Sequence, residues 1–220
     1  MSTELKKRII TSFFLVLLLI GMYRYSFVMI CSLIIIGMIV WVEFYALISK
    51  IIKKNSIKDK ILRLIYKSIS LLYISSLVYF IIYIESYYLH LKLYLLYSVL
   101  ISILSDIGGL TVGKIFKGKK LTKISPNKTI SGSIGSFIFS LFLVIFLYDK
   151  FINYDFLILV LIIITISLIS QLGDLFISYL KRKAKVKNTS DILPGHGGLL
   201  DRVDGIIFTI PVGILLFSFI

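Results

Sequence analysis

The sequence has few acidic residues, two histidines and one cysteine, and these shortages narrow the range of functions. Asp and Glu number 11 in 220 residues, against 25 Lys and Arg. The single cysteine, Cys31, excludes an intramolecular disulfide and a metal site of several cysteines within one chain. The chain is instead rich in apolar residues, with 58% hydrophobic residues and a mean hydropathy of +0.99. These values predict an all-α, polytopic integral membrane protein.

Seven apolar runs are candidates for transmembrane helices, which take about 20 residues to cross the hydrocarbon core. They are residues 9–22, 27–48, 64–84, 93–110, 134–147, 156–175 and 205–220. The first run follows a basic start, as in a signal peptide. Because Tyr23, Arg24 and Tyr25 stand where small cleavage-site residues belong, we expect a retained first span.

The basic residues lie in alternate connections between these runs. Residues 6–8, 50–63, 112–132 and 177–204 hold 21 of the 25 Lys and Arg. Basic loops stay in the cytoplasm, so the pattern predicts a cytoplasmic N-terminus and an odd number of spans in the cytoplasmic membrane. The net charge of +14 is thus gathered at a membrane face. This placement favours anionic headgroups and anionic substrates over nucleic acid.

Three aspartates stand near the predicted inner ends of the last two spans: Asp174, Asp201 and Asp204. If the last helix begins near Leu199, Asp201 and Asp204 share one helical face, with β-carbons about 5 to 6 Å apart. That spacing suits a hard divalent cation such as Mg²⁺. The alternative is that the aspartates pair with neighbouring Lys or Arg side chains, or cap the helix.

Two further polar segments have two interpretations each. The step "GHGG", residues 195–198, lets the backbone approach a ligand and offers N–H groups to phosphate, or it is a flexible turn. The segment "ISPNKTISG", residues 124–132, is either a phosphate-binding segment or an ordinary turn and helix cap.

Two further features lie on or after the fourth apolar run. "GKIFKGKK", residues 113–120, ends in Lys120 where a P-loop has Ser or Thr, which argues against that motif. Asp106 is an intramembrane carboxylate and hence a candidate functional residue.

From Ser105 to Gly205 the chain resembles the phosphatidate cytidylyltransferases, also called CDP-diacylglycerol synthases. Their C-terminal signature is matched in register by 13 residues: Ser178, Lys181, Arg182, Lys187, Ser190, Leu193, Pro194, His196, Gly197, Gly198, Asp201, Arg202 and Asp204. The segments "QLGDL" and "SPNKT" are similar to two others in the family. Asn188, Ser131 and residues 107–110 depart from its usual pattern.

The resemblance implies transfer of a cytidylyl group from CTP to phosphatidate, which gives CDP-diacylglycerol and pyrophosphate. It divides the chain into N-terminal spans, residues 1–104, and a catalytic region, residues 105–220. The implied catalytic residues are Asp174, Lys181, Arg182, His196, Asp201, Arg202 and Asp204. The implied substrate contacts are Asp106, Ser125, Lys128, Thr129, Ser178, Lys187, Gly197 and Gly198.

The three aspartates would bind Mg²⁺, as part of a one- or two-cation site facing the cytoplasm. The implied partners are CTP, phosphatidate, membrane lipids and a second copy in a homodimer, without nucleic acid. Rival functions are a CTP-dependent enzyme acting on another lipid phosphate or polyprenol, and a small transporter or membrane scaffold without catalysis. A CDP-alcohol phosphotransferase is disfavoured, because Ile206, Ile207 and Phe208 follow "DRVDG" where that signature has polar and small residues.

Overall fold

The computed structural model describes residues 3–53, 56–122, 125, 128–147 and 155–219. Over these residues the regular elements are helices, and no sheet is formed. The helices are α1 (Thr3–Arg24), α2 (Ser26–Ile51), α3 (Ile57–Tyr87), η1 (Leu89–Leu91), α4 (Lys92–Phe116), α5 (Ile130–Leu147), α6 (Phe156–Lys183), α7 (Leu200–Val203) and α8 (Ile206–Ser218).

Each of the seven predicted apolar runs corresponds to a helix, namely α1 to α6 and α8. Four helical stretches are long and apolar enough to cross a membrane: Ser26–Ile51, Ile57–Tyr87, Leu89–Phe116 and Phe156–Lys183. Shorter apolar helical stretches cover Ile9–Arg24 and Ile130–Ile145. The predicted all-α, multi-pass membrane fold is therefore confirmed.

The chain forms two compact units, and their division differs from the predicted one at residue 104. The first unit comprises residues 1–88 and 180–203, and the second comprises residues 89–179 and 204–220. The division at residue 104 separates N-terminal spans from a catalytic region, whereas the observed units are defined by packing. The assignment of catalysis to residues 105–220 therefore stays a prediction.

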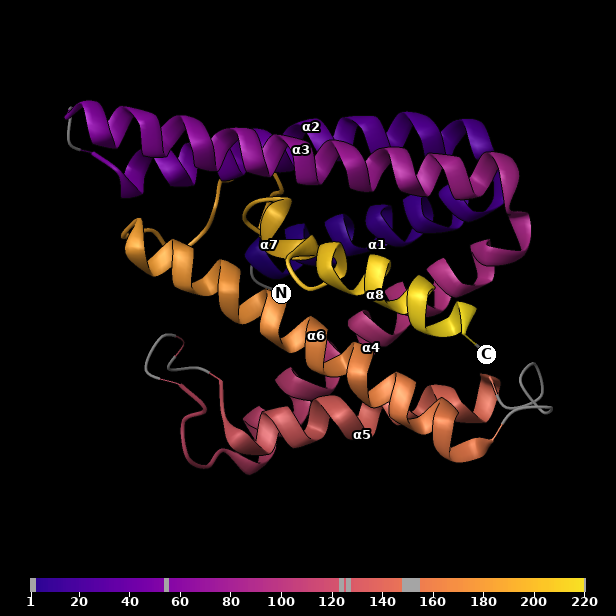
Figure 1. Cartoon of the computed structure of the whole chain (residues 1–220). Helices are drawn as coiled ribbons and strands as arrows, with labels where there is room; N and C mark the ends of the chain where they lie inside the picture. The colour runs from indigo at the N-terminus through magenta and orange to yellow at the C-terminus, as the bar shows by residue number, and fades with distance from the viewer. Residues whose placement is uncertain (1–2, 54–55, 123–124, 126–127, 148–154, 220) are drawn as a thin grey trace. The chain divides into compact units, whose positions relative to one another are not determined.

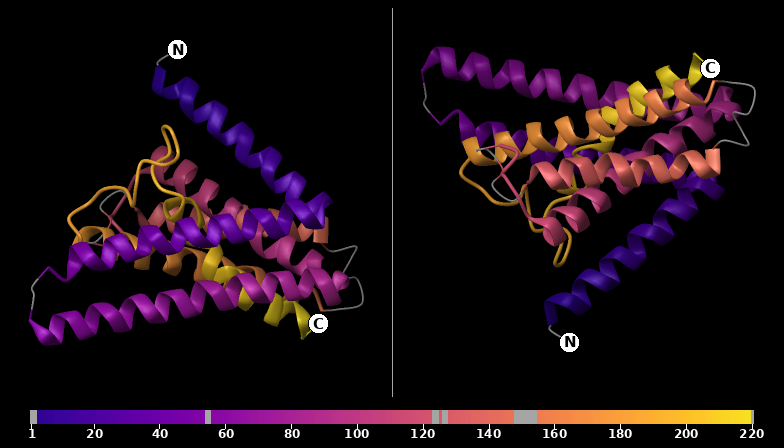
Figure 2. Two further views of the ribbon diagram at one scale, coloured as in Figure 1. Left: turned by 90° about the horizontal axis from the view of Figure 1, so that it is seen from above. Right: turned by 90° about the horizontal axis from the view of Figure 1, so that it is seen from below.

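In the first unit, α2 and α3 run side by side (Figure 1). Gly37 makes their approach possible, because a Cβ there would lie 2.9 Å from a methyl carbon of Val78. The hydroxyl of Ser26 donates a hydrogen bond of 2.6 Å to Glu85, which ties the start of α2 to the end of α3. Figure 2 shows α1 diverging from α2 beyond the turn at Tyr25.

In the second unit, the core is built from α4, α5, α6 and α8. Its buried side chains are Ile101, Leu143, Val144, Leu147, Leu159, Ile162, Ile163, Ile166 and Phe217. Helices α4 and α5 meet backbone to backbone, since a Cβ on Gly108 would lie 2.3 Å from the carbonyl oxygen of Gly135. Small residues permit such close helix packing inside membranes.

Buried serines connect α4 to α6 within this second unit. The hydroxyls of Ser102 and Ser170 are 2.7 Å apart, and those of Ser105 and Ser167 are 3.0 Å apart. Because the hydrocarbon offers no water to satisfy a hydroxyl, such pairs hold helices together. They fix the part of α6 that precedes Asp174.

The start of the last apolar run differs from the expectation. Asp201 lies in the short helix α7, which ends at Val203, whereas Asp204 and Gly205 form a turn before α8. The prediction that Asp201 and Asp204 share one face of a continuous helix was therefore wrong. Gly205 itself packs closely against α6, since a Cβ there would lie 2.5 Å from the hydroxyl of Ser170.

Candidate functional site

The loop between α6 and α7, residues 184–199, carries four of the eight predicted site residues of the first unit. Its tightest turn is closed by two backbone hydrogen bonds between Leu193 and Gly197, of 2.9 and 3.1 Å. Gly195 and Gly197 have φ values of 77° and 82°, which side chains disfavour. The glycines of "GHGG" therefore serve a turn in this structure.

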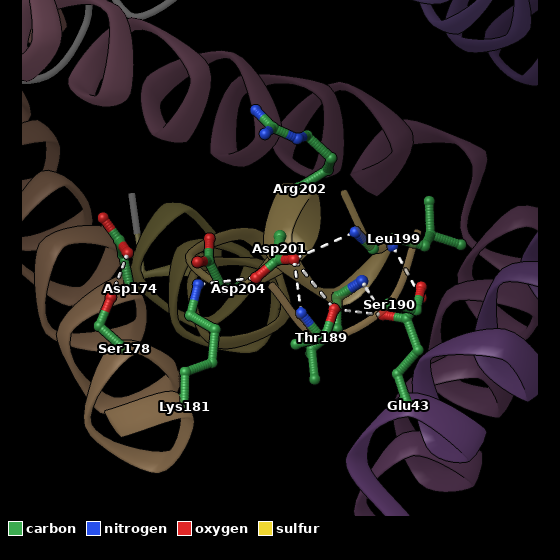
Figure 3. Close-up of polar contacts among 12 residues, drawn as sticks. Glu43, Asp174, Ser178, Lys181, Thr189, Ser190, Leu199, Asp201, Arg202 and Asp204 are labelled. Carbon is green, nitrogen blue, oxygen red and sulfur yellow. Dashed lines mark hydrogen bonds and ion pairs between the residues drawn. The ribbon is translucent and has the colours of Figure 1, made fainter. Parts of the chain in front are cut away.

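The carboxylate of Glu43, in α2, anchors this loop by hydrogen bonds. It is 2% exposed, and its two carboxylate oxygens accept four hydrogen bonds (Figure 3). The hydroxyls of Thr189 and Ser190 donate at 2.8 and 2.5 Å. The amides of Leu199 and Leu200 donate at 3.0 and 2.7 Å. A carboxylate fully surrounded by donors is stable when buried, and here it fixes both the loop and the start of α7.

The carboxylate of Asp201, in α7, also accepts hydrogen bonds from this loop. Its Oδ1 accepts a hydrogen bond from the Lys181 ammonium at 2.7 Å. Its Oδ2 accepts from the amides of Thr189 and Gly198, at 2.9 and 3.1 Å, and from the Thr189 hydroxyl at 3.0 Å. The pairing with Lys181 is the alternative that the sequence left open for this aspartate.

The surroundings of Asp201 shift its pKa. Burial raises the pKa of the carboxyl, but the Lys181 ammonium and the amides of Thr189 and Gly198 together lower it more, so that the net shift is downward from the ordinary value of 3.8. Asp201 is therefore an anion at neutral pH.

The amides of the glycine step are engaged within the loop. Those of His196 and Gly197 donate to the Leu193 carbonyl, and that of Gly198 donates to Asp201. Of the two interpretations of this step, the structure supports the turn, in which these N–H groups donate within the loop. The physical reason is that nearby acceptors satisfy them first. A substrate contact by Gly197 or Gly198 stays a prediction.

A further contact links His196 of the loop to Arg202 of α7. The Arg202 guanidinium donates two hydrogen bonds to the His196 carbonyl, of 2.7 and 3.1 Å. Nε2 of the His196 ring lies 3.3 Å from the Ser12 hydroxyl of α1. Arg202 is exposed, as are Arg182 and Lys187. These cations are accessible to anionic molecules, as expected of phosphate-binding side chains.

In the second unit, Lys128 forms an ion pair with Oδ2 of Asp174. The Ser178 hydroxyl, one turn further along α6, donates to Oδ1 of Asp174 at 3.3 Å (Figure 3). Gly173 brings the backbone of the turn at Asp204 against α6, since its Cβ would lie 2.7 Å from the Asp204 carbonyl oxygen. Asp204 is 5% exposed. The structure therefore brings together Lys128, Asp174 and Ser178 among the predicted residues.

The segment before α5 has the predicted turn and cap. The Thr129 hydroxyl accepts a hydrogen bond of 3.0 Å from the Gly132 amide, as an N-cap does. The Ser131 hydroxyl donates to the Lys117 carbonyl. Ser125 is buried, and its carbonyl accepts from the Lys128 amide at 3.0 Å. Asp106 is half-buried on α4. Phosphate binding by these residues stays a prediction.

The donor atoms of the predicted cation site fit a hard divalent ion, because all are carboxylate oxygens. Among the described residues there is no group of three or more His, Cys, Asp or Glu side chains that could hold a metal. Asp174 and Asp201 each carry a lysine partner instead. Metal binding by these aspartates stays a prediction.

Glu43 was not predicted as a site residue from the sequence. Its partners lie 146 to 157 residues further along the chain, so that no local pattern reveals them. One signal was present: a single carboxylate inside an apolar run is a functional-site candidate by default, as was argued for Asp106.

The apolar helices, four stretches of which are long and apolar enough to cross a membrane, define a multi-pass membrane protein. The chain belongs to the cytidylyltransferase family, whose model matches residues 1–220.

Three similar proteins carry the name phosphatidate cytidylyltransferase. That of Staphylococcus haemolyticus (strain JCSC1435) is 43% identical over 121 residues, which cover 54% of this chain and 46% of that protein. That of Staphylococcus aureus (strain COL) is 45% identical over 121 residues, with the same coverage. That of Rickettsia typhi (strain Wilmington) is 46% identical over 108 residues, 46% of this chain and 47% of that protein. The matches span about half the length of these relatives.

Proposed function

We propose that this chain transfers the cytidylyl group of CTP to phosphatidate, which forms CDP-diacylglycerol and releases pyrophosphate. The observation that carries the proposal is membership of the cytidylyltransferase family across the whole chain. Support for the lipid substrate comes from the name of relatives 43 to 46% identical to this chain.

The reaction joins two anions, so charge neutralisation is the main task of the site. A phosphate oxygen of phosphatidate attacks the α-phosphorus of CTP, and the bond from that phosphorus to the bridging oxygen of the β-phosphate breaks. The attacking oxygen is already deprotonated, and a strong general base is unnecessary. Pyrophosphate leaves with the electron pair of the broken bond.

The ion pairs of the two units fit this task. Lys128 and Lys181 are each held by an aspartate in the structure described here. A phosphate oxygen that takes one of these ammonium groups leaves a carboxylate available to a cation. Exposed Arg182, Lys187 and Arg202 supply further charge for the triphosphate.

Mg²⁺ is the cofactor in this proposal, held by oxygens of Asp174, Asp201 and Asp204. When bound, it supplies positive charge against the phosphates. We further propose that the site faces the cytoplasm, because CTP is soluble and the basic loops predict that orientation. Assembly into a homodimer stays a prediction.

The test uses the full-length purified chain in detergent micelles with phosphatidate, Mg²⁺ and CTP labelled in the cytosine ring. The proposal predicts a labelled lipid that co-migrates with CDP-diacylglycerol and depends on all three components. Replacing phosphatidate by an isoprenoid phosphate, or labelled CTP by dATP labelled in its base, should abolish the labelled lipid. Labelled product from the isoprenoid phosphate alone would instead identify the rival polyprenol enzyme.

A further inference from the structure

Helices α2 and α3 enclose a groove of about 420 Å³ that the proposed reaction does not use. Trp41 and Tyr45 line it from α2. The α3 residues that line it are Lys60, Arg63, Leu64, Lys67, Ser68 and Leu71. All of them belong to the first unit.

The groove is strongly cationic. Lys60, Arg63 and Lys67 follow one another at intervals of three and four residues, which places them on one face of α3. Of the described residues that line the groove, none is acidic. The Lys67 ammonium lies over the Tyr45 ring, 3.3 Å from its centroid, and the Trp41 indole N–H donates to the Lys67 carbonyl at 3.4 Å. The first contact holds the charged side chain of Lys67 in the groove, and the second holds Trp41 against the backbone of α3.

The same groove has an apolar wall. Leu64 and Leu71 are 67% and 44% exposed, on a helix long and apolar enough to span a membrane. From Lys60 near the start of α3 to Leu71 the helix rises about 16 Å, at about 1.5 Å per residue. The lining therefore extends from the level of headgroups into that of acyl chains.

This combination selects one kind of occupant. A soluble anion would meet the cations but leave the leucines uncovered, and an apolar molecule would cover the leucines but offer no charge to the basic side chains. A phospholipid with a net negative headgroup satisfies both, because its phosphate meets the cations while an acyl chain covers the leucines. We propose that the groove between α2 and α3 is a binding site for an anionic phospholipid of the surrounding leaflet.

The fluorescence of Trp41 can report on lipid binding in this groove. Trp41 is the single tryptophan in the sequence and lines the groove. Full-length protein is reconstituted into vesicles in which either phosphatidylglycerol or phosphatidylcholine carries brominated acyl chains, and quenching of tryptophan fluorescence is compared. Phosphatidylglycerol is used, and CTP is omitted, so that the result does not depend on the proposed reaction or its substrate.

The proposal predicts stronger quenching by brominated phosphatidylglycerol than by brominated phosphatidylcholine. Replacing Lys60 and Arg63 together by Ala should lower the relative affinity for phosphatidylglycerol roughly 10- to 30-fold, at about 1 kcal/mol for each basic residue. Lys58→Ala removes a charge from the same end of α3 but not from the groove lining, and it should keep the preference. Circular dichroism checks that each variant is folded.

Equal quenching by the two lipids in the unaltered protein would overturn the proposal. So would an unchanged preference in the folded double variant, or an equal loss in Lys58→Ala, which would assign the effect to overall surface charge. If the double variant does not fold, Lys67→Met decides the question, since it keeps the apolar stem and removes only the charge.

Discussion

The Lys181 ammonium lies 2.7 Å from Oδ1 of Asp201, so that a side chain predicted to bind phosphate neutralises one predicted to bind a cation. In the second unit Lys128 and Asp174 form the same kind of pair. Both carboxylates are thus balanced by lysine in this structure.

Acid should weaken the first of these pairs. The pKa of Asp201 is lowered in the folded protein, so the carboxylate contributes stability above its ordinary value of 3.8, and this contribution is lost as the pH falls through the lower, folded value. Asp201→Asn should therefore lower the melting temperature at pH 7, and the difference from the unaltered protein should shrink below about pH 3.8. Asp191→Asn, at an exposed position in the same loop, is the control. A difference that does not change with pH would contradict the assignment.

Glu43→Gln should loosen the loop while leaving α2 intact. An amide nitrogen cannot accept the hydrogen bonds that one carboxylate oxygen of Glu43 now receives, and so the amide of Leu199 or Leu200 loses its partner. Leaving a buried N–H unsatisfied costs about 1 to 3 kcal/mol. The same free energy predicts that hydrogen exchange at these two amides accelerates roughly 5- to 150-fold.

The matched control for this change is Glu85→Gln, which alters another buried carboxylate of the first unit, bonded to Ser26. It should leave the exchange of the Leu199 and Leu200 amides unchanged. Equal acceleration in both variants would show that Glu43 acts through general stability instead of through the loop.

Gly198→Ala should disrupt the loop strongly, although the substitution adds only one methyl group. An added Cβ would lie 1.8 Å from the Thr189 hydroxyl oxygen and 2.7 Å from a Glu43 oxygen. Relief requires breaking the hydrogen bonds that hold the loop, and we expect a loss of about 2 kcal/mol or more. Thermal unfolding measures it. Gly21→Ala, whose Cβ would meet Val28 at an ordinary 3.5 Å, should be nearly neutral.

Asp174→Asn tests the aspartate that is paired with Lys128 in the second unit. If its charge serves the proposed reaction, CDP-lipid formation should fall by about two to three orders of magnitude while the helical content stays unchanged. Asp155→Asn is the control on the same helix, because Asp155 caps the start of α6 through the Leu157 amide. That variant should lower stability slightly and keep turnover. Normal turnover by Asp174→Asn would exclude it from the site.

The apolar runs predicted the helices well because hydrophobic length is a local property of the chain. The break at Asp204 and Gly205 was not predicted, because the hydrophobic pattern gives the length of an apolar run but not the residue at which a helix ends. For the same reason α7 and α8 read as one helix in the sequence.

The site was predicted in part. Charged residues near "LPGHGGLLDRVDG" marked the loop, and the pairing of Asp201 with Lys181 was among the alternatives. The role of Glu43 depends on donors that lie about 150 residues away, as the separation of 146 residues from Thr189 shows. Long-range pairing of this kind leaves no spacing pattern that sequence reasoning can use.

The central claim is that the α-phosphate of CTP is transferred to a lipid. The purified full-length chain is incubated with phosphatidate and Mg²⁺, and with CTP labelled either at the α- or at the γ-phosphorus. The account predicts that α-label enters the lipid phase as CDP-diacylglycerol, while γ-label leaves as pyrophosphate in equal amount. γ-Label in the lipid, or release of label without a lipid product, would contradict it.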